Sequence, residues 1–430
     1  METIKEMVST QGLTLKILVM TSLYPPHFRG GAELSCQSHA EGLQERGHEV
    51  FILTSSWGVD TGKVEGNVYR LLNYDKSRLS LGFKKHSSDP LRLWRRLYQL
   101  RRALFLSKNY HIARKVVAAT RPDVAYVWHM GDVSINPILA AQDLGIPIVF
   151  RLPDYWLAQL TSELCLEHNP LKKWYRSMLS GFGGFDRLDT SHLLPNSGAV
   201  MRQYLEAGFP VDRLHVIPNG LPYDLIINVN DLLTLPMFAQ SGVLRLLFAG
   251  RVERLKGPDV AIQTLAHLKG ELGVEQAHLD IIGEGPKEYE SELRNMVGLL
   301  GLERSVSFLG RIDHAQLLDR YSGYDALLLT SRWAEPFSRT MMEAMGRGLP
   351  VVATNTGGTV EVISDGNNGL LVPPDDPMAM AMAVRKLLSD PGLVQKIRCN
   401  ALATLREKYA LERIIEQVEA YLQDTVLHVI

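Results

Sequence analysis

Cysteine is scarce in this chain of 430 residues, which contains only Cys36, Cys165 and Cys399. Their odd number and wide spacing match neither a disulfide framework nor a metal-binding Cys-x-x-Cys pair, so we expect a reducing, cytoplasmic setting. The first residues mix acids with bases and include no apolar stretch, which argues against a signal peptide. A run of about 18 apolar residues is missing as well, so we expect no membrane-spanning helix.

An Asp-x-Asp triplet is also absent from the sequence. We therefore expect no divalent metal held by that motif, and no cofactor is indicated by other patterns. Hydrophobic residues make up 46% of the chain and charged residues 22%, which is ordinary for a globular protein. The length favours two domains.

The chain contains one strongly basic segment, although its net charge is only −1. Residues 76–121 hold thirteen Lys or Arg and a single acid, Asp89, which gives this segment a charge of +12. Because its leucines recur at helical spacing, residues 84–115 are a candidate site for an anionic membrane surface or an anionic acceptor such as a lipid pyrophosphate. The alternative is a surface helix whose leucines pack on its own domain. No nucleic-acid-binding motif accompanies the charge, so we expect no nucleic-acid partner.

Short apolar runs separated by helical patterns indicate a doubly wound parallel sheet, and they occur in two series. The first series comprises residues 15–20, 50–54, 124–128, 146–150 and 192–194. The second comprises residues 244–249, 279–282, 306–309, 326–330, 351–353 and 370–372. A proline-rich linker near 220–242 separates them, and apolar residues at helical spacing predict a final helix over 411–423. We therefore predict two Rossmann-like domains, residues 1–222 and 223–410, with 411–430 packing back on the first.

Ligands in such sheets bind beyond the carboxyl ends of the strands, so the loops there carry the candidate site. Arg251 and Lys256 follow the first strand of the second series, and two cations so placed suit a diphosphate. The alternative is a pair of solvated surface charges. Glu335 and Glu343 flank the start of a predicted helix after residue 330. Carboxylates accept hydrogen bonds from sugar diols, although an acid early in a helix is also a common partner of the helix dipole.

Backbone groups add to this set. The amides of Phe337, Ser338, Arg339 and Thr340 would form a helix N-terminus suited to phosphate or sugar oxygens. Gly30 and Gly31 precede another predicted helix, where they form either an anion site or a simple turn. Gly283 and Gly285 would let a ligand approach the backbone, and Arg311 and Ile312 would present backbone groups to a flat base.

Four segments resemble, in order and spacing, the C-terminal half of glycosyltransferase family 4, the glycogen-synthase or group 1 type. They are GRVERLKG, IIGEGP, FLGRI and EPFSRTMMEAMGRGLPVVATNTGGTVEVISDGNNGLLVPPDD. SLYPP with GGAE, LLPNS and VIPNG are similar to the N-terminal half. The resemblance implies an α/β fold of the GT-B architecture: two facing Rossmann-like domains with parallel sheets and a C-terminal helix that crosses back.

The resemblance also implies roles for individual residues. Arg251 and Lys256 would bind the donor diphosphate, which Gly31 would approach. Glu335 would hold the sugar hydroxyls near the reacting carbon, and Glu343 the ribose hydroxyls. One departure from the family is Pro153, which replaces a histidine often assigned to the reaction centre. His129 and Asp154 are the candidates to replace this histidine. The alternative for His129 is a structural role, as a histidine at the end of a strand whose hydrogen bonds are made within the protein.

The sequence thus predicts a retaining hexosyltransferase that moves a sugar from a UDP- or GDP-sugar to a glycan, a lipid-linked acceptor or a small molecule. Its expected location is the cytoplasm, with peripheral attachment to a membrane. Two alternatives stay open: a catalytically idle protein that binds nucleotide sugars, and a GT-B epimerase or phosphorylase.

Overall fold

The computed structural model describes residues 13–59, 62–75, 92–165, 184–234 and 242–428. The chain divides into two compact units. Unit 1 comprises Met1–Asn196, Val200–Ile217 and Ile415–Ile430, and unit 2 comprises Ser197–Ala199 and Pro218–Ile414. The chain therefore enters unit 2 near residue 218 and returns to unit 1 near residue 415, whereas the sequence places these changes at 222/223 and 410/411.

The sheet of unit 1 has the strand order β3-β4-β2-β1-β5-β6-β7. All neighbouring strands are parallel except β3 and β4. The strands are β1 Lys16–Met20, β2 Glu49–Ser55, β3 Lys63–Glu65, β4 Val68–Leu72, β5 Val124–Val127, β6 Ile148–Leu152 and β7 Leu193–Pro195. The central strands β1, β5 and β6 are buried almost throughout, which explains their continuous apolar sequences.

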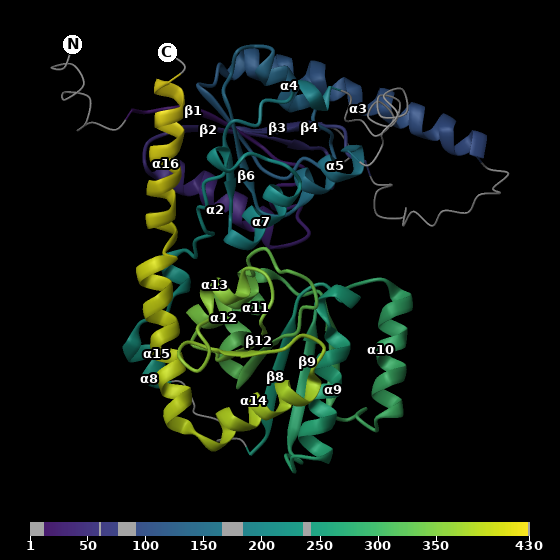
Figure 1. Cartoon of the computed structure of the whole chain (residues 1–430), viewed down its shortest axis with the longest axis vertical. Coiled ribbons are helices and arrows are strands. Elements are labelled where there is room, and N and C mark those ends of the chain that lie inside the picture. The colour runs from purple at the N-terminus through teal and green to yellow at the C-terminus, as the bar shows by residue number, and fades with distance from the viewer. Residues whose placement is uncertain (1–12, 60–61, 76–91, 166–183, 235–241, 429–430) are drawn as a thin grey trace. The chain divides into compact units, whose positions relative to one another are not determined.

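The helices of unit 1 connect these parallel strands (Figure 1). They are α2 Gly31–Glu45, α3 Arg92–Thr120, α4 Asn136–Gln142, α5 Trp156–Cys165 and α7 Gly198–Glu206, the last of which begins within unit 2. Short 3-10 turns occupy Phe185–Arg187 and Val211–Arg213. α3 contacts strands β1, β2 and β4, and α4 contacts β5 and β6.

The sheet of unit 2 is parallel and has the order β10-β9-β8-β11-β12-β13. Its strands are β8 Leu244–Ala249, β9 Ala277–Ile282, β10 Val306–Gly310, β11 Ala326–Leu329, β12 Val351–Thr354 and β13 Leu370–Val372. Two apolar cores cover its faces: in β8, Leu246 and Phe248 belong to one core and Leu247 and Ala249 to the other. Alternate residues therefore enter different cores, as a strand between two helical layers requires.

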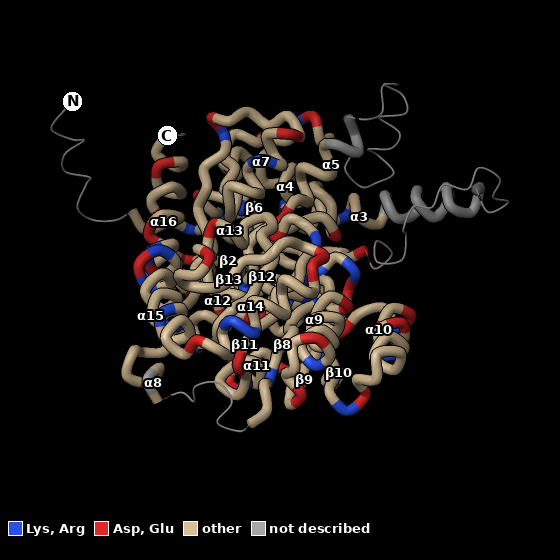
Figure 2. Tube along the Cα trace, turned by 60° about the horizontal axis from the view of Figure 1, so that its bottom comes forward, with Lys and Arg blue, Asp and Glu red and all other residues tan. Residues whose placement is uncertain are grey.

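The helices of unit 2 supply those layers (Figure 1). They are α8 Val229–Thr234, α9 Pro258–Gly270, α10 Lys287–Leu299, α11 His314–Arg320, α12 Arg339–Gly346, α13 Thr359–Val362, α14 Pro377–Ser389 and α15 Pro391–Lys408. Short 3-10 turns lie at Tyr223–Leu225, Arg254–Lys256 and Tyr321–Gly323. Few residues of the strands are charged. Figure 2 shows Lys and Arg interspersed with Asp and Glu along the described chain.

The last helix, α16 Leu411–Leu427, is four residues longer than predicted. Four of its apolar side chains, Ile414, Ile415, Val418 and Leu422, are at most 1% exposed. From Ile415 onward the helix belongs to unit 1, where Glu419 pairs with Arg46 at 2.6 Å and with His48 at 2.9 Å.

Two local features differ from the sequence-based expectations. Gly31 was expected to precede its helix but is the first residue of α2, with Gly30 as the N-cap and the Glu33 side chain accepting a hydrogen bond from the Gly30 amide. Strands β3 and β4 were not predicted at all. β3 is exposed along its length and β4 only partly buried, so neither shows the apolar run that marks the other strands.

Candidate functional site

An ion pair joins two of the predicted residues of unit 2. Lys256 ends the 3-10 turn after β8, and Glu335 lies in the loop between β11 and α12. The Lys256 Nζ atom is 2.6 Å from Glu335 Oε1 and 2.7 Å from Oε2. The side chains are 17% and 8% exposed, so the ammonium and the carboxylate are largely withdrawn from water.

Two neutral donors also bind the Glu335 carboxylate. The Ser331 hydroxyl and the Trp333 indole N–H each donate to Oε2 at 2.9 Å. Lys256 Nζ lies 5.4 Å from the centre of the Trp333 ring, within the range of a cation–π contact. Ser331 and Trp333 were not predicted from the sequence, because their partners are recognised only once the loop is folded.

The backbone of Glu335 is fixed by two glycines that follow β12. The Gly358 amide donates to the Glu335 carbonyl at 2.6 Å. At Gly357, where φ is +56°, an added Cβ would lie 2.2 Å from the Glu335 carbonyl oxygen and 2.3 Å from its amide nitrogen. Only glycine therefore fits at position 357 without displacing Glu335.

Glu343 lies in a second polar cluster, within α12. His314 Nε2 and Arg339 Nε both lie 2.7 Å from Oε1, and the Tyr321 hydroxyl donates to Oε2 at 3.4 Å. Burial raises the pKa of this carboxyl, but the hydrogen bond to His314 and the charge of Arg339 outweigh burial and leave the pKa below its usual value. Glu343 is therefore an anion at neutral pH. His314 and Tyr321 were not predicted from the sequence.

The start of α12 is capped by the side chain of its N-cap residue. Ser338 is the N-cap, and its hydroxyl accepts a hydrogen bond from the Met341 amide at 3.3 Å. Phe337 is buried against Tyr409, with ring centres 5.7 Å apart, so its side chain belongs to the core. Thr340, in the first turn of α12, is partly exposed.

The other predicted residues of unit 2 have partners outside the Lys256–Glu335 pair. Arg251 pairs with Glu253 at 3.0 Å and is 53% exposed. Arg311 pairs with Glu284 at 3.4 Å, and Ile312 packs on the core. At Gly283 an added Cβ would lie 1.8 Å from the Gly250 carbonyl oxygen. Gly283 thus allows the backbone at Gly250 to pack closely against it, whereas the sequence predicted the close approach of a ligand.

In unit 1, His129 and Asp154 are hydrogen-bonded to each other. His129 Nδ1 lies 2.9 Å from Asp154 Oδ2, and His129 Nε2 lies 3.9 Å from Asp132 Oδ2. The other Asp154 oxygen accepts the Trp156 amide at 3.0 Å. Burial lowers the pKa of His129, but Asp154, Asp132 and Glu33 together outweigh it and raise the pKa to about 9. The imidazole is therefore a cation at neutral pH.

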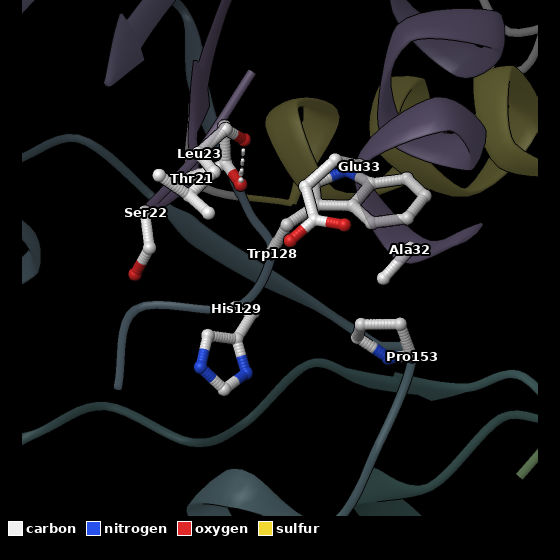
Figure 3. A pocket seen from close by; sticks show the side chains of 8 residues that line it. All are labelled: Thr21, Ser22, Leu23, Ala32, Glu33, Trp128, His129 and Pro153. Atoms are coloured by element: carbon white, nitrogen blue, oxygen red, sulfur yellow. Dashed lines mark hydrogen bonds between the residues drawn. The ribbon is translucent and has the colours of Figure 1, made fainter. Parts of the chain in front are cut away.

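A small pocket brings His129 together with the start of α2. It is lined by Thr21, Ser22, Leu23, Ala32, Glu33, Trp128, His129 and Pro153, and the Glu33 and His129 side chains both face it (Figure 3). Burial raises the pKa of Glu33, whose Oε2 accepts the Gly30 amide at 3.1 Å. Glu33 is thus held by the Gly30 amide in the first turn of α2. Glu33 lies in the GGAE segment, and no role was predicted for it from the sequence.

The basic segment forms a helix, as predicted, from Arg92. Residues 76–91 lie outside the described part of the chain, as do the side chains of residues 92–104, so the proposed anionic face is not described. No helix in the described residues is both long and apolar enough to cross a membrane.

Two family models match the chain. Residues 239–404 match the model described as "Glycosyl transferases group 1", and residues 29–225 match the model described as "Glycosyltransferase Family 4". The two matched ranges do not overlap, and each lies largely within one structural unit.

Curated relatives bear names of the same kind. An uncharacterized glycosyltransferase of Methanocaldococcus jannaschii is 25% identical over 94% of this chain and 96% of its own length. A D-inositol 3-phosphate glycosyltransferase of Xylanimonas cellulosilytica is 31% identical over 51% of this chain and 53% of its own length. A glycogen synthase of Mycobacterium tuberculosis is 34% identical, but over only 36% of this chain and 37% of its own length.

Solved structures share the fold across nearly the whole chain. HepE from Anabaena, solved in complex with UDP and glucose, covers 95% of this chain and 100% of its own with a TM-score of 0.68 and 22% identity. Sucrose-phosphate synthase from Thermosynechococcus elongatus covers 96% of this chain and 99% of its own, with a TM-score of 0.69 and 18% identity.

Proposed function

We propose that this chain, which belongs to the group 1 glycosyltransferases with the GT-B fold, transfers a hexose from a nucleoside diphosphate donor to an acceptor hydroxyl with retention of configuration. The observation that carries the proposal is the largely buried Lys256–Glu335 pair, which places a cation and a carboxylate within 2.6 Å of each other beyond the carboxyl ends of β8 and β11. A cation suits a diphosphate, and a carboxylate suits sugar hydroxyls. HepE has been solved with UDP-glucose, which supports a UDP-hexose as the first donor to test, followed by GDP-hexoses.

Departure of the nucleoside diphosphate places negative charge on the β-phosphate. In the proposal, Lys256 and Arg251 stabilise that charge, together with the backbone amides near Ser338 at the start of α12. The amide of Met341 is engaged by the Ser338 hydroxyl, so the amides nearer the N-terminus are assigned to the phosphate or sugar. Because these side chains and amides supply the positive charge, the proposal includes no metal ion.

The two glutamates have separate assignments. Glu335 binds hydroxyls of the donor sugar, and Glu343 binds the ribose diol. In Glu343, Oε1 already receives two hydrogen bonds at 2.7 Å, and among the described residues Oε2 has the weaker contact from Tyr321 at 3.4 Å. Oε2 is therefore the atom that we assign to the ribose.

Attack from the same face as the leaving group accounts best for retention in this site. The acceptor oxygen bonds to the anomeric carbon as the bond to the β-phosphate oxygen breaks, and the acceptor proton passes to the departing phosphate. This route needs no protein base, and His129, whose pKa is raised to about 9, is protonated at neutral pH. His129 and Asp154 are then assigned to positioning an acceptor at the Glu33 pocket. A trapped glycosyl adduct on Glu335 would contradict this route.

The acceptor in this proposal is a glycan, a lipid-linked sugar or a small hydroxylated molecule. We place the enzyme in the cytoplasm, attached peripherally to anionic membranes through residues 84–115. The support is the charge of +12 over residues 76–121.

Turnover of nucleotide sugars tests the proposal. With UDP-, GDP- and ADP-hexoses, at least one donor should release free sugar slowly and react faster with an acceptor mixture. Lys256→Met and Glu335→Gln should each lower that rate about 100-fold, as loss of a preorganised transition-state contact does. Lys386→Met and Glu288→Gln, which alter exposed residues of unit 2, are the matched controls.

Two outcomes distinguish the alternatives. Tight nucleotide-sugar binding without turnover would identify a catalytically idle binding protein. Turnover that inverts the configuration at a hydroxyl-bearing carbon of the bound sugar would identify an epimerase. Turnover that consumes inorganic phosphate would identify a phosphorylase.

A further inference from the structure

The two oxygens of Glu335 have unequal partners. Oε2 receives hydrogen bonds from Ser331 and Trp333, both at 2.9 Å, in addition to Lys256 at 2.7 Å. For Oε1 the structure shows the Lys256 ammonium at 2.6 Å. Ser331 and Trp333 therefore hold one carboxylate oxygen, Oε2, and the Lys256 ammonium contacts both oxygens.

A bound diphosphate changes this balance. The Lys256 ammonium has three hydrogens, and it directs two short contacts at Glu335. When it turns toward phosphate oxygens, Oε1 loses its donor while Oε2 keeps Ser331 and Trp333. Oε1 then becomes the carboxylate atom with free acceptor capacity, and a sugar hydroxyl is the group that fills it.

The Trp333 side chain contacts both partners of the ion pair. Its N–H is bonded to Glu335, and its ring lies 5.4 Å from the Lys256 ammonium. The N–H keeps Oε2 in place after Lys256 moves, and the ring gives the moving ammonium an attractive surface. Removing the N–H alone leaves Ser331 as a neutral donor to Oε2, so the carboxylate is held less firmly while the charge available to the diphosphate is unchanged.

We propose that Trp333 is a positioning and sugar-recognition residue of the donor site: with Ser331 it fixes Oε2 of Glu335, so that Oε1 is presented to a donor hydroxyl once Lys256 binds the diphosphate. This inference rests on the proposed function. It implies that the diphosphate and the sugar are recognised in a linked order, because Glu335 is neutralised by Lys256 until the diphosphate arrives.

The test compares two ligands in calorimetric titrations: the free nucleoside diphosphate and the matching nucleotide hexose, with the base that the wild type prefers. Trp333→Phe keeps an aromatic ring and removes the N–H. It should leave the Kd of the free diphosphate within about twofold and raise the Kd and KM of the nucleotide hexose about tenfold, the effect of one hydrogen bond to a charged group. Ser331→Ala removes the other neutral donor and should show the same pattern.

Trp333→Leu removes both the N–H and the ring. It should weaken the free diphosphate as well, by about threefold, because the cation–π contact is lost. A merely structural role for Trp333 would weaken both ligands equally in Trp333→Phe.

The outcomes separate the two claims. If the wild type binds the nucleotide hexose and Trp333→Phe binds both ligands as the wild type does, or loses both equally, the role of Trp333 is overturned while the proposed function stands. If the wild type binds no nucleotide sugar of any base, the proposed function fails, and the inference fails with it.

Discussion

The charged side chains at this site differ more in their interaction partners than in their residue types. Lys256 and Glu335 neutralise each other in a largely buried pair, and Glu343 is kept anionic by His314 and Arg339. Arg251, which has the same formal charge as Lys256, is half exposed and paired with its near neighbour Glu253. The cation with the stronger structural case for the diphosphate is therefore Lys256.

The protonation of His129 gives a pH-dependent prediction. Its folded-state pKa is raised to about 9 by Asp154, Asp132 and Glu33, so its contribution to stability is complete below the unfolded-state pKa near 6.5 and is lost as the pH rises through 9. We expect the free energy of unfolding in urea to fall by about 1–2 kcal/mol more in the wild type than in His129→Gln between pH 7 and pH 10.

Asp154 should be the main cause of that effect. In Asp154→Asn the pKa of His129, followed by NMR of its ring protons, should fall by about 1–2 units. An unchanged pKa in this variant would show that the 2.9 Å contact does not govern His129.

At the residue scale, sequence reasoning found the charged residues but not their partners. Arg251, Lys256, Glu335 and Glu343 follow strands that the apolar pattern had located. Ser331, Trp333 and His314 carry no pattern of their own, because their contacts depend on how separate loops meet. Glu33 was visible in GGAE, but only the pocket gives it a position.

At the scale of elements, Gly357 in the loop after β12 allows the loop that carries Glu335 to pack closely against it. Gly357→Ala would bring a Cβ within 2.2 Å of the Glu335 backbone at a residue with φ of +56°. We expect a loss of stability of about 2–4 kcal/mol and a large loss of nucleotide-sugar binding, measured by urea unfolding and calorimetric titration.

Gly366→Ala is the matched control for that variant. Its φ is +67°, but an added Cβ meets open space. It should cost only the backbone strain of about 1 kcal/mol and leave binding intact. Equal binding losses in the two variants would contradict a specific role for Gly357.

The N-cap of α12 gives a smaller effect. Ser338→Ala removes the acceptor of the Met341 amide and should lower the free energy of unfolding by about 1 kcal/mol. Ser338→Asp, which keeps an acceptor, should retain most of that stability. A serine at this position is therefore explained by capping, whatever the ligand.

At the element scale, the strands with buried faces were predictable from their continuous apolar runs. Strands β3 and β4 were not, because solvent covers much of their surface and their sequences are accordingly mixed. The start of α2 was misplaced because two glycines usually signal a turn, whereas here Gly30 is the N-cap and its amide donates to the Glu33 side chain.

Across the whole molecule, α16 links the two units in sequence. Leu422 is fully buried in the part of the helix that belongs to unit 1, and Leu427 on the same helix is 51% exposed. Leu422→Ala should lower the free energy of unfolding by about 2–5 kcal/mol, whereas Leu427→Ala should change it by less than about 0.5 kcal/mol. Urea unfolding followed by circular dichroism would measure both, and equal effects would contradict the assigned burial.

The whole-molecule architecture was the most predictable level. Two series of buried strands, each with intervening helices, were enough to indicate two parallel sheets, and the family resemblance supplied the GT-B fold. Donor identity and acceptor identity were not predictable, because both depend on loop side chains whose types recur in many sites.

Calorimetric scanning with nucleotide sugars tests the central claim most directly. At a concentration of about 100 times its Kd, one of UDP-, GDP- and ADP-hexose should stabilise the wild type by ~2.7 kcal/mol, with little stabilisation of Lys256→Met at the same concentration. If none of these ligands stabilised the wild type, or if Lys256→Met responded as the wild type does, the assignment of a nucleotide-sugar site to the Lys256–Glu335 pair would be contradicted.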